Sequence, residues 1–144
     1  MYTGLQHLHS YLAYLVLAGL LVSIIYALMG YSSKRSFTDR DRKMGLLGLV
    51  PAHIQLLAGI LLYFVSPLGL PNAGGDAMKD SVSRLYFLEH PLMMVIALVL
   101  ITVGYSRSKR LTNDQTRFKS IWLFYGLGLI LILLRLPWNA WPGN

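Results

Sequence analysis

The 144-residue chain contains no cysteine and little charge, with 13% charged and 55% hydrophobic residues. The absence of cysteine excludes disulfides, thiolate metal sites and iron–sulfur clusters held by thiolates. Any bound metal must therefore be held by histidine, carboxylate or thioether groups. The scarcity of charge and a mean hydropathy of +0.52 are untypical of a soluble domain and predict an integral membrane protein that lies in a lipid bilayer.

Four apolar stretches reach or approach the ~20-residue length that crosses a hydrocarbon core of about 30 Å. They cover residues 5–29, 44–65, 85–105 and 121–136. Because the connections between them are short, consecutive spans are expected to be neighbours. The predicted fold is an all-α membrane protein, an up-down-up-down bundle of four transmembrane helices that forms a single domain over residues 1–144.

The basic residues give this bundle an orientation. Ten of the thirteen Lys and Arg residues lie in the first and third loops, namely Lys34, Arg35, Arg40, Arg42, Lys43, Arg107, Lys109, Arg110, Arg117 and Lys119. The positive-inside rule places these two loops in the cytoplasm and both termini outside. The net charge of +7 is therefore interpreted as a topology signal, and no nucleic-acid partner is predicted.

Ionisable residues inside the predicted spans are the candidate functional groups. They are His7 and His9 on the first span, His53 on the second, Glu89 and His90 on the third, and Arg135 on the fourth. An arginine in the centre of a membrane helix costs at least ~2.5 kcal/mol on insertion scales, so such positions indicate function by default. The stretch "FLEHPLMM" joins the only glutamate of the chain to a histidine and a proline.

Two imidazoles from different helices are the axial ligand set of haem b. His53 and His90 are the first candidate pair, and His9 with His90 is the competing pair. Counting at about 1.5 Å per residue staggers the members of each pair by ~9 Å in depth. A stripe of small residues on the second span offers clearance for a macrocycle, and Arg135 offers a partner for its propionates. The stripe includes Gly48, Ala52 and Gly59; simple helix packing is the other interpretation of it.

Two further interpretations stay open. A copper or zinc site near the outer surface would use His7, His9, His90 and Glu89. A cofactor-free network of Glu89, His90 and Arg135 would instead fix the helix register or pass protons in a larger complex. On a regular helix Glu89 points about 100° away from His90, which predicts separate roles for the two side chains.

Four segments resemble a family of small bacterial four-helix membrane proteins described as cytochrome b-like. The segments are "LQHLHSYLAYLVL", "AHIQLLAGILLYFVSPLG", "LYFLEHPLMMVIALVLITVGYSRSKR" and "FYGLGLILILLRLPW". The resemblance implies a haem-associated protein of electron transport in the bacterial inner membrane, with periplasmic termini. It places His53 and His90 at the family's histidine positions, with His7 and His9 as further candidates. A respiratory or other membrane-complex partner or a homo-oligomer is expected, because the chain is too small for most independent enzymatic chemistry.

Overall fold

The computed structural model describes residues 1–142, and this part of the chain is helical without any β-strand. Four long helices make up most of it: α1 (Tyr2–Ser33), α2 (Asp39–Val65), α5 (His90–Arg110) and α6 (Asp114–Leu134). The segment between α2 and α5 contains a 3-10 turn (Leu70–Asn72), α3 (Gly75–Lys79), α4 (Ser81–Arg84) and a π-helical turn (Leu85–Glu89). Gly143 and Asn144 of the expected domain lie outside the described residues.

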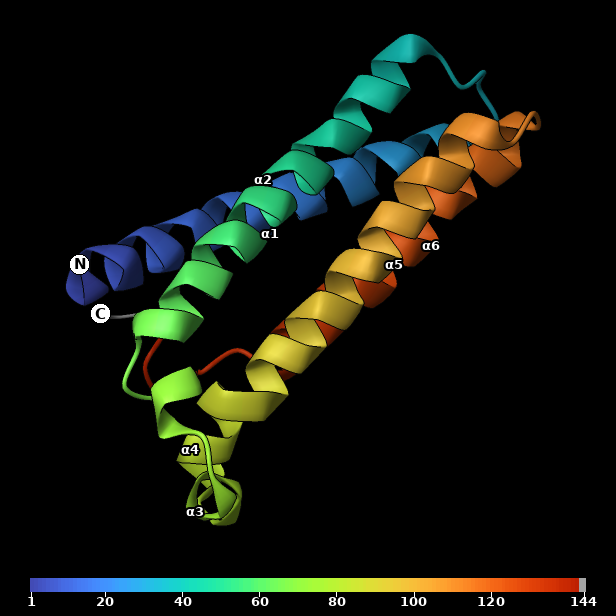
Figure 1. The fold of residues 1–144 in the computed structure, drawn as a ribbon. Coiled ribbons are helices and arrows are strands. Elements are labelled where there is room, and N and C mark those ends of the chain that lie inside the picture. Colours follow the sequence, from blue (N-terminus) through green and yellow to red (C-terminus); the bar gives the residue numbers. More distant parts are fainter. Residues whose placement is uncertain (143–144) are drawn as a thin grey trace.

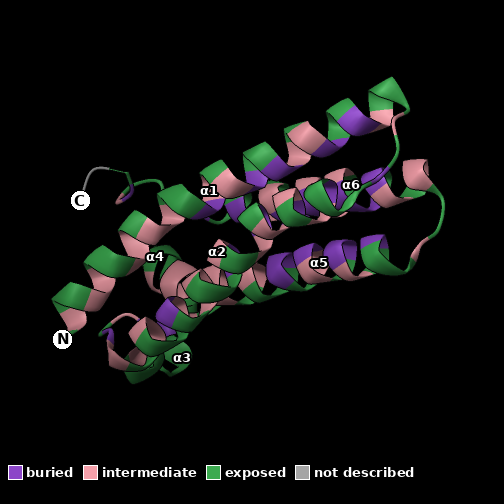
Figure 2. Cartoon of the chain, turned by 90° about the horizontal axis from the view of Figure 1, so that it is seen from above, coloured by how far each residue is buried: buried purple, intermediate pink, exposed green. Residues whose placement is uncertain are grey.

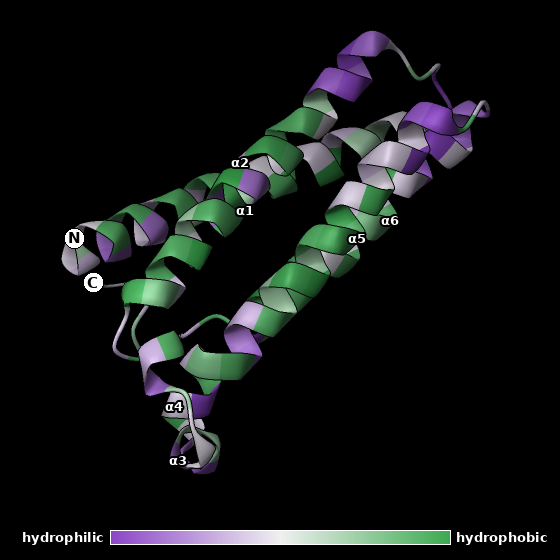
Figure 3. Cartoon of the chain, viewed as in Figure 1, coloured by the Kyte–Doolittle hydropathy of each residue, from purple (hydrophilic) through white to green (hydrophobic). Residues whose placement is uncertain are grey.

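Four helical segments are long and apolar enough to cross a membrane, which confirms the prediction of four spans. Figure 3 shows an apolar middle on each long helix and hydrophilic residues gathered where α1 meets α2 and α5 meets α6. The helices run past the predicted span limits because polar residues also adopt helical structure outside the apolar core. Two C-terminal limits are exceptions: α2 ends at the predicted Val65, and α6 ends at Leu134, before Leu136 and Pro137.

The four long helices pack as a ring in which α1 contacts α2 and α6, and α5 contacts α6 and, less extensively, α2. Helices α1 and α5 therefore face each other across the diagonal of the bundle. Figure 1 shows two helix pairs that come together near the α1–α2 and α5–α6 connections. We call this the loop end, defined by residues 34–38 and 111–113. The terminal end holds the N-terminus, residues 66–90 and residues 135–142, of which Trp141 bonds to Ser10 of α1 (Figure 1).

Prolines expose backbone carbonyls that other helices use. Pro51 has no N–H, so the carbonyl of Leu47 lacks its usual partner four residues along α2. Gly19 of α1 lies against this carbonyl, and a Cβ at Gly19 would collide with it. Nearby, the Ser23 hydroxyl donates to the Met44 carbonyl at 2.7 Å and accepts from the Gly48 N–H at 3.1 Å. The α1–α2 contact is thus close, and Ser23 links the two helices through two hydrogen bonds.

The small residues of α2 make room for neighbouring side chains. The Tyr125 hydroxyl of α6 is completely buried and donates to the Gly45 carbonyl at 2.7 Å. A Cβ at Gly48 would lie 3.0 Å from both Leu20 and Tyr125. Ala52 is also buried. At Gly48 and Ala52 the stripe therefore serves helix packing, the alternative interpretation given above.

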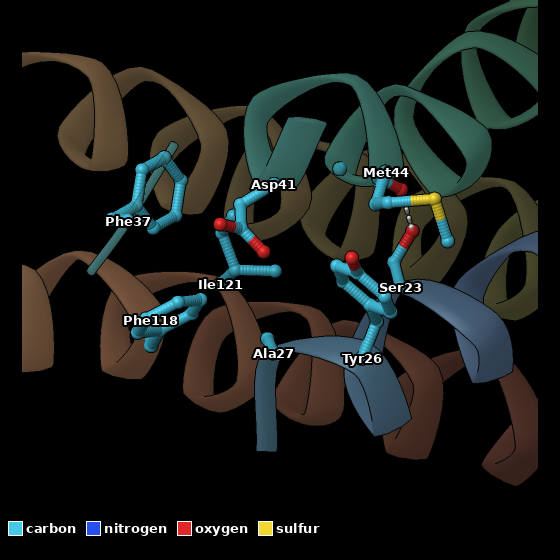
Figure 4. A pocket seen from close by; sticks show the side chains of 9 residues that line it. Ser23, Tyr26, Ala27, Phe37, Asp41, Met44, Phe118 and Ile121 are labelled. Atoms are coloured by element: carbon cyan, nitrogen blue, oxygen red, sulfur yellow. Dashed lines mark hydrogen bonds between the residues drawn. The ribbon is translucent and has the colours of Figure 1, made fainter. Parts of the chain in front are cut away.

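The loop end contains a buried carboxylate. Asp41 is only 3% exposed, and its carboxylate lies 2.7 and 2.8 Å from two nitrogens of the Arg35 guanidinium. It also accepts from the backbone N–H of Thr38 at 2.8 Å, which completes a capping box at the start of α2. Figure 4 shows Asp41 between Phe37, Phe118 and Ile121, in a space too narrow for a water molecule.

Burial differs between the two halves of the bundle. In α1 the buried residues begin at Val16, and in α5 they begin at Ala97. Residues 1–15, 59–65 and 85–96 contain no buried residue, although all belong to helices. Figure 2 shows the same difference, with buried residues concentrated along the half of α1, α5 and α6 nearer the loop end. The terminal half is therefore the more openly packed half.

Candidate histidine site at the terminal end

The local sequence shapes the backbone around His90. Because Pro91 cannot donate a hydrogen bond, the Phe87 carbonyl lacks its helical partner. The Tyr63 hydroxyl of α2 supplies the missing donor at 3.0 Å. The N–H of His90, the residue directly before Pro91, donates to the Leu85 carbonyl five residues back. This bond defines the π-helical turn. Such turns shift the following side chains around the helix axis, and they occur frequently at functional sites.

His90 is oriented by a backbone carbonyl from another helix. Its Nδ1 donates to the Arg135 carbonyl at 2.7 Å. Arg135 directly follows α6, where the last carbonyls have no helical N–H to bind. Because a neutral imidazole carries one N–H, this bond leaves Nε2 as the free ring nitrogen. An imidazole fixed in this way by a carbonyl is the usual state of a metal-binding histidine.

His9 faces His90 from the diagonally opposite helix. The two ring centroids are 6.2 Å apart and the ring planes are nearly perpendicular, at 89°. The His9 ring lies against Gly59, where a Cβ would come within 3.0 Å of its Cε1 atom. Gln55 donates to the His9 carbonyl at 2.8 Å and holds this turn of α1 against α2. The Nδ1 atom of His9 is buried and makes no hydrogen bond.

Glu89 connects two arginines beside the histidine pair. Its carboxylate lies 3.0 Å from Arg84 Nε and 3.8 Å from Arg135 Nε. Arg84 also donates to the Met78 carbonyl, so Glu89 ties the segment before α5 to the end of α6. Glu89 and His90 use different atoms of Arg135, the guanidinium and the carbonyl respectively. The Glu89–His90–Arg135 arrangement considered above is thus formed, with His9 adjoining it.

The remaining two histidines lie elsewhere. His7 is exposed and stacks on Tyr11, with ring centroids 6.4 Å apart. His53 is exposed between α2 and α5, and its Nε2 lies 3.5 Å from the Thr102 hydroxyl oxygen. Thr102 is twelve residues beyond His90, which corresponds to about 18 Å of helix. The structure therefore brings His9 to His90 and does not bring His53 beside it.

Within residues 1–142, no three His, Asp or Glu side chains come together as a set that could hold a metal ion. Of the four residues considered for copper or zinc, only His9 and His90 face each other. The Glu89 carboxylate pairs with Arg84 and Arg135, and the His7 ring stacks on Tyr11. The two ring centroids of His9 and His90 lie 6.2 Å apart, which is less than the ~9 Å depth difference expected from counting residues along each helix.

Two residues that support the site were not among the sequence candidates. Tyr63 satisfies the carbonyl that Pro91 leaves free, and Arg84 pairs with Glu89. The signal for Tyr63 is present in the sequence, since a proline inside a helix always frees the carbonyl four residues before it. No sequence signal identifies which helix supplies the donor.

Comparison of the chain with protein-family models, curated proteins and solved structures finds no match. The assignment of function therefore rests on the geometry of the site.

Proposed function

We propose that the protein binds haem b in the terminal half of the bundle through His9 and His90 and takes part in electron transfer. The observation that carries the proposal is the approach of two imidazoles from diagonally opposite helices, with ring centroids 6.2 Å apart. Haem supplies one-electron redox chemistry when it is bound by two axial imidazoles. The chain's own residues hold, orient and enclose the group.

Three features of the residues fit such a group. His90 has its Nδ1 fixed by a carbonyl, and His9 has a buried Nδ1 without a partner. Gly59 provides a surface without a Cβ behind the His9 ring. The Arg135 side chain is 44% exposed and belongs to the residue whose carbonyl binds His90, where its guanidinium would meet a propionate. The segments nearest the pair, residues 1–15, 59–65 and 85–96, also contain no buried residue.

Haem is favoured over copper or zinc by the number of ligands. A porphyrin provides four equatorial nitrogens, so two imidazoles complete the iron coordination. A structural zinc ion requires four ligands, and catalytic zinc usually has three from the protein. The described residues bring together only two histidines. A copper or zinc role is the weaker proposal for that reason.

For the membrane topology, we propose an up-down-up-down bundle in the bacterial inner membrane with both termini in the periplasm. The basic residues of the two loops at the loop end support a cytoplasmic position for that end. The histidine pair would then lie in the outer half of the membrane. Electron exchange would involve a membrane-complex partner or a second copy of the chain.

The direct test is a reduced-minus-oxidised spectrum and a haem extraction on the protein purified in mild detergent from cells with adequate haem. We expect the spectrum of a bis-imidazole b-type haem and recovery of haem by extraction. Protein that is well folded yet colourless would contradict the proposal. Stoichiometric copper or zinc in elemental analysis of such a colourless protein would support the metal alternative.

A cofactor-free function is a second candidate, favoured by the bonds of Glu89 and His90 to Arg135. These contacts join the third and fourth spans and would stabilise an accessory subunit without any haem. This alternative predicts that His90→Leu lowers the stability of the bundle or of its complex. It also predicts no optical change and no metal in the purified wild-type protein.

A further inference from the structure

The net charge of the chain is concentrated at the loop end and the helix turns beside it. Residues 34–43 and 107–119 contain ten basic and three acidic residues, which gives a formal charge of +7. The rest of the chain contains three basic and three acidic residues and is formally neutral. The ion pair between Arg35 and the buried Asp41 cancels internally, so the positive surplus belongs to the other side chains of these two segments.

Two of these cations meet at one tyrosine between α2 and α5. Arg42 Nη1 donates to the Tyr105 hydroxyl oxygen at 3.4 Å. The Lys109 ammonium lies over the Tyr105 ring, 5.1 Å from the ring centroid. Tyr105 is only 7% exposed, and its ring packs against Gly45, where a Cβ would lie 3.3 Å from Cδ2. Tyr105 is therefore a fixed support that holds a cation from each helix.

The cluster of Arg42, Tyr105 and Lys109 keeps positive charge and a hydrogen-bond donor in reserve. Within residues 1–142, the Tyr105 hydroxyl accepts from Arg42 but donates to no acceptor. In the same part of the chain, one carboxylate pairs with the cluster, that of Asp39, which lies 2.9 Å from Arg42 Nε and 3.4 Å from Lys43 Nζ. Arg42, Lys43 and Lys109 thus carry three positive charges beside the single negative charge of Asp39.

The cluster lies at the level where the apolar part of both helices ends. The predicted spans begin at residue 44 on α2 and end at residue 105 on α5, so Arg42 and Lys109 are just outside them. Figure 3 shows the change from apolar to hydrophilic residues at this end of the two helices. In a bilayer, lipid phosphates occupy the boundary of the hydrocarbon core and the acyl chains lie along the apolar residues beyond it.

We propose that Arg42, Tyr105 and Lys109 bind the phosphate of an anionic phospholipid. Arg42 and Lys109 would supply charge-assisted hydrogen bonds to the phosphate oxygens, and the Tyr105 hydroxyl would donate a further one. An anionic lipid is favoured over a zwitterionic one, because the latter brings a cationic group to a site that already has surplus positive charge. It is favoured over a soluble phosphate because its acyl chains also contact the apolar spans.

The test counts individual lipids bound to the wild-type protein by native mass spectrometry in mild detergent. The probes are phosphatidylglycerol, phosphatidylcholine with the same acyl chains, and glycerophosphoglycerol, which is the phosphatidylglycerol headgroup without acyl chains. We expect one saturable site for phosphatidylglycerol and about tenfold weaker binding of phosphatidylcholine. The free headgroup should not bind at the same concentrations.

Matched variants separate this site from a general attraction to positive charge. Arg42→Gln and Lys109→Gln should each weaken phosphatidylglycerol binding about fivefold. Tyr105→Phe keeps the ring and the net charge but removes the hydroxyl, and it should also weaken binding about fivefold. Lys119→Gln is the control, because it removes the same charge from an exposed position on α6, which lies diagonally opposite α2. This variant should bind like the wild type.

Three outcomes would overturn the proposal. The first is equal affinity for phosphatidylglycerol and phosphatidylcholine. The second is equal weakening by Lys109→Gln and Lys119→Gln, which would show a diffuse attraction without a site. The third is binding of the free headgroup as tightly as the whole lipid, which would assign the cluster to a soluble phosphate. None of these measurements involves His9, His90 or haem, so this proposal and the proposed function fail separately.

Discussion

The loop half and the terminal half of the bundle use their polar groups differently. In the loop half, Ser23, Asp41 and Tyr125 are buried and each is bonded to a neighbouring segment, whereas the buried Trp122 Nε1 makes no hydrogen bond. In the terminal half, His9 keeps a buried nitrogen without a partner, and His90 is bonded through one nitrogen only. Polar groups that are fully bonded stabilise a fold, whereas oriented groups with free lone pairs are available to a ligand. Under the proposed function, the loop half provides stability and the terminal half provides the binding site.

The largest effect on stability is expected from Asp41→Ala in the loop half. The substitution removes the capping acceptor of α2 and leaves the Arg35 guanidinium without its carboxylate. We expect a loss of about 3 kcal/mol in the free energy of unfolding, measured by denaturant titration in mild detergent. Asp39→Ala is the matched control, because Asp39 is on the same helical turn but its side chain is 65% exposed. Equal losses for the two variants would contradict the assigned role of Asp41.

A pair of glycine substitutions tests the close α1–α2 contact. Gly19→Ala should destabilise the bundle by about 2 kcal/mol, because the new Cβ collides with the Leu47 carbonyl. Gly126→Ala should stabilise it by about 0.5 to 1 kcal/mol, since no atom lies near the new Cβ and alanine favours the helix. Thermal unfolding monitored by circular dichroism measures both. A stabilising Gly19→Ala would show that the two helices do not approach closely there.

In the terminal half, Gly59→Ala should affect the histidine pair more than the fold. The new Cβ would lie 3.0 Å from His9 Cε1 and displace the ring by a few tenths of an ångström. We expect a loss of stability below about 1 kcal/mol, since His9 and residues 60–65 are not buried. Haem affinity should fall clearly in the same variant. Gly4→Ala, where the new Cβ meets no atom, should change neither property.

The smallest effect concerns the segment before α5. Asp80 caps α4 by accepting from the Ser83 N–H at 3.0 Å, and this bond holds the pKa of the Asp80 carboxyl below its ordinary value of 3.8. Because the pKa of Asp80 is lower in the folded state, the cap is fully formed above pH 3.8. It is lost as the pH falls through the folded-state pKa. Hydrogen exchange at the Ser83 amide should therefore be slow above pH 3.8 and should become faster as the pH falls through the folded-state pKa of Asp80.

Asp80→Ser separates capping from titration in this segment. Serine keeps an acceptor for the Ser83 N–H but has no titrating carboxyl. Its Ser83 protection should be close to wild type at neutral pH and should not change in acid. Acid sensitivity that persists in Asp80→Ser would assign the effect to another group.

The four helices that could span a membrane could be predicted because the length of each apolar stretch is visible directly in the sequence. The helix limits were less accurate, since α2 already begins at Asp39 and the predicted span begins at residue 44. The ion pair between Arg35 and the buried Asp41 was not predicted. A partner six residues away depends on the path of the loop, which sequence periodicity does not describe.

The histidine site could be predicted only in part. His90 was common to both candidate haem pairs and to the alternative interpretations, and the structure places it at the centre of the site. Its neighbour could not be chosen, because helix tilt decides which residues of α1 and α2 reach the level of His90. The π-helical turn at Leu85–Glu89 adds a rotation that regular helical counting omits. The free carbonyls caused by Pro51 and Pro91 were predictable, but their partners Gly19 and Tyr63 were not.

The central claim is tested most directly by titrating haem into the haem-free protein and four single variants, each histidine changed to leucine. Absorbance of the bound haem gives the affinity and the ligation state. The account predicts that His9→Leu and His90→Leu each lose bis-imidazole ligation, while His7→Leu and His53→Leu bind haem as the wild type does. Loss of ligation in His53→Leu with retention in His9→Leu would contradict it.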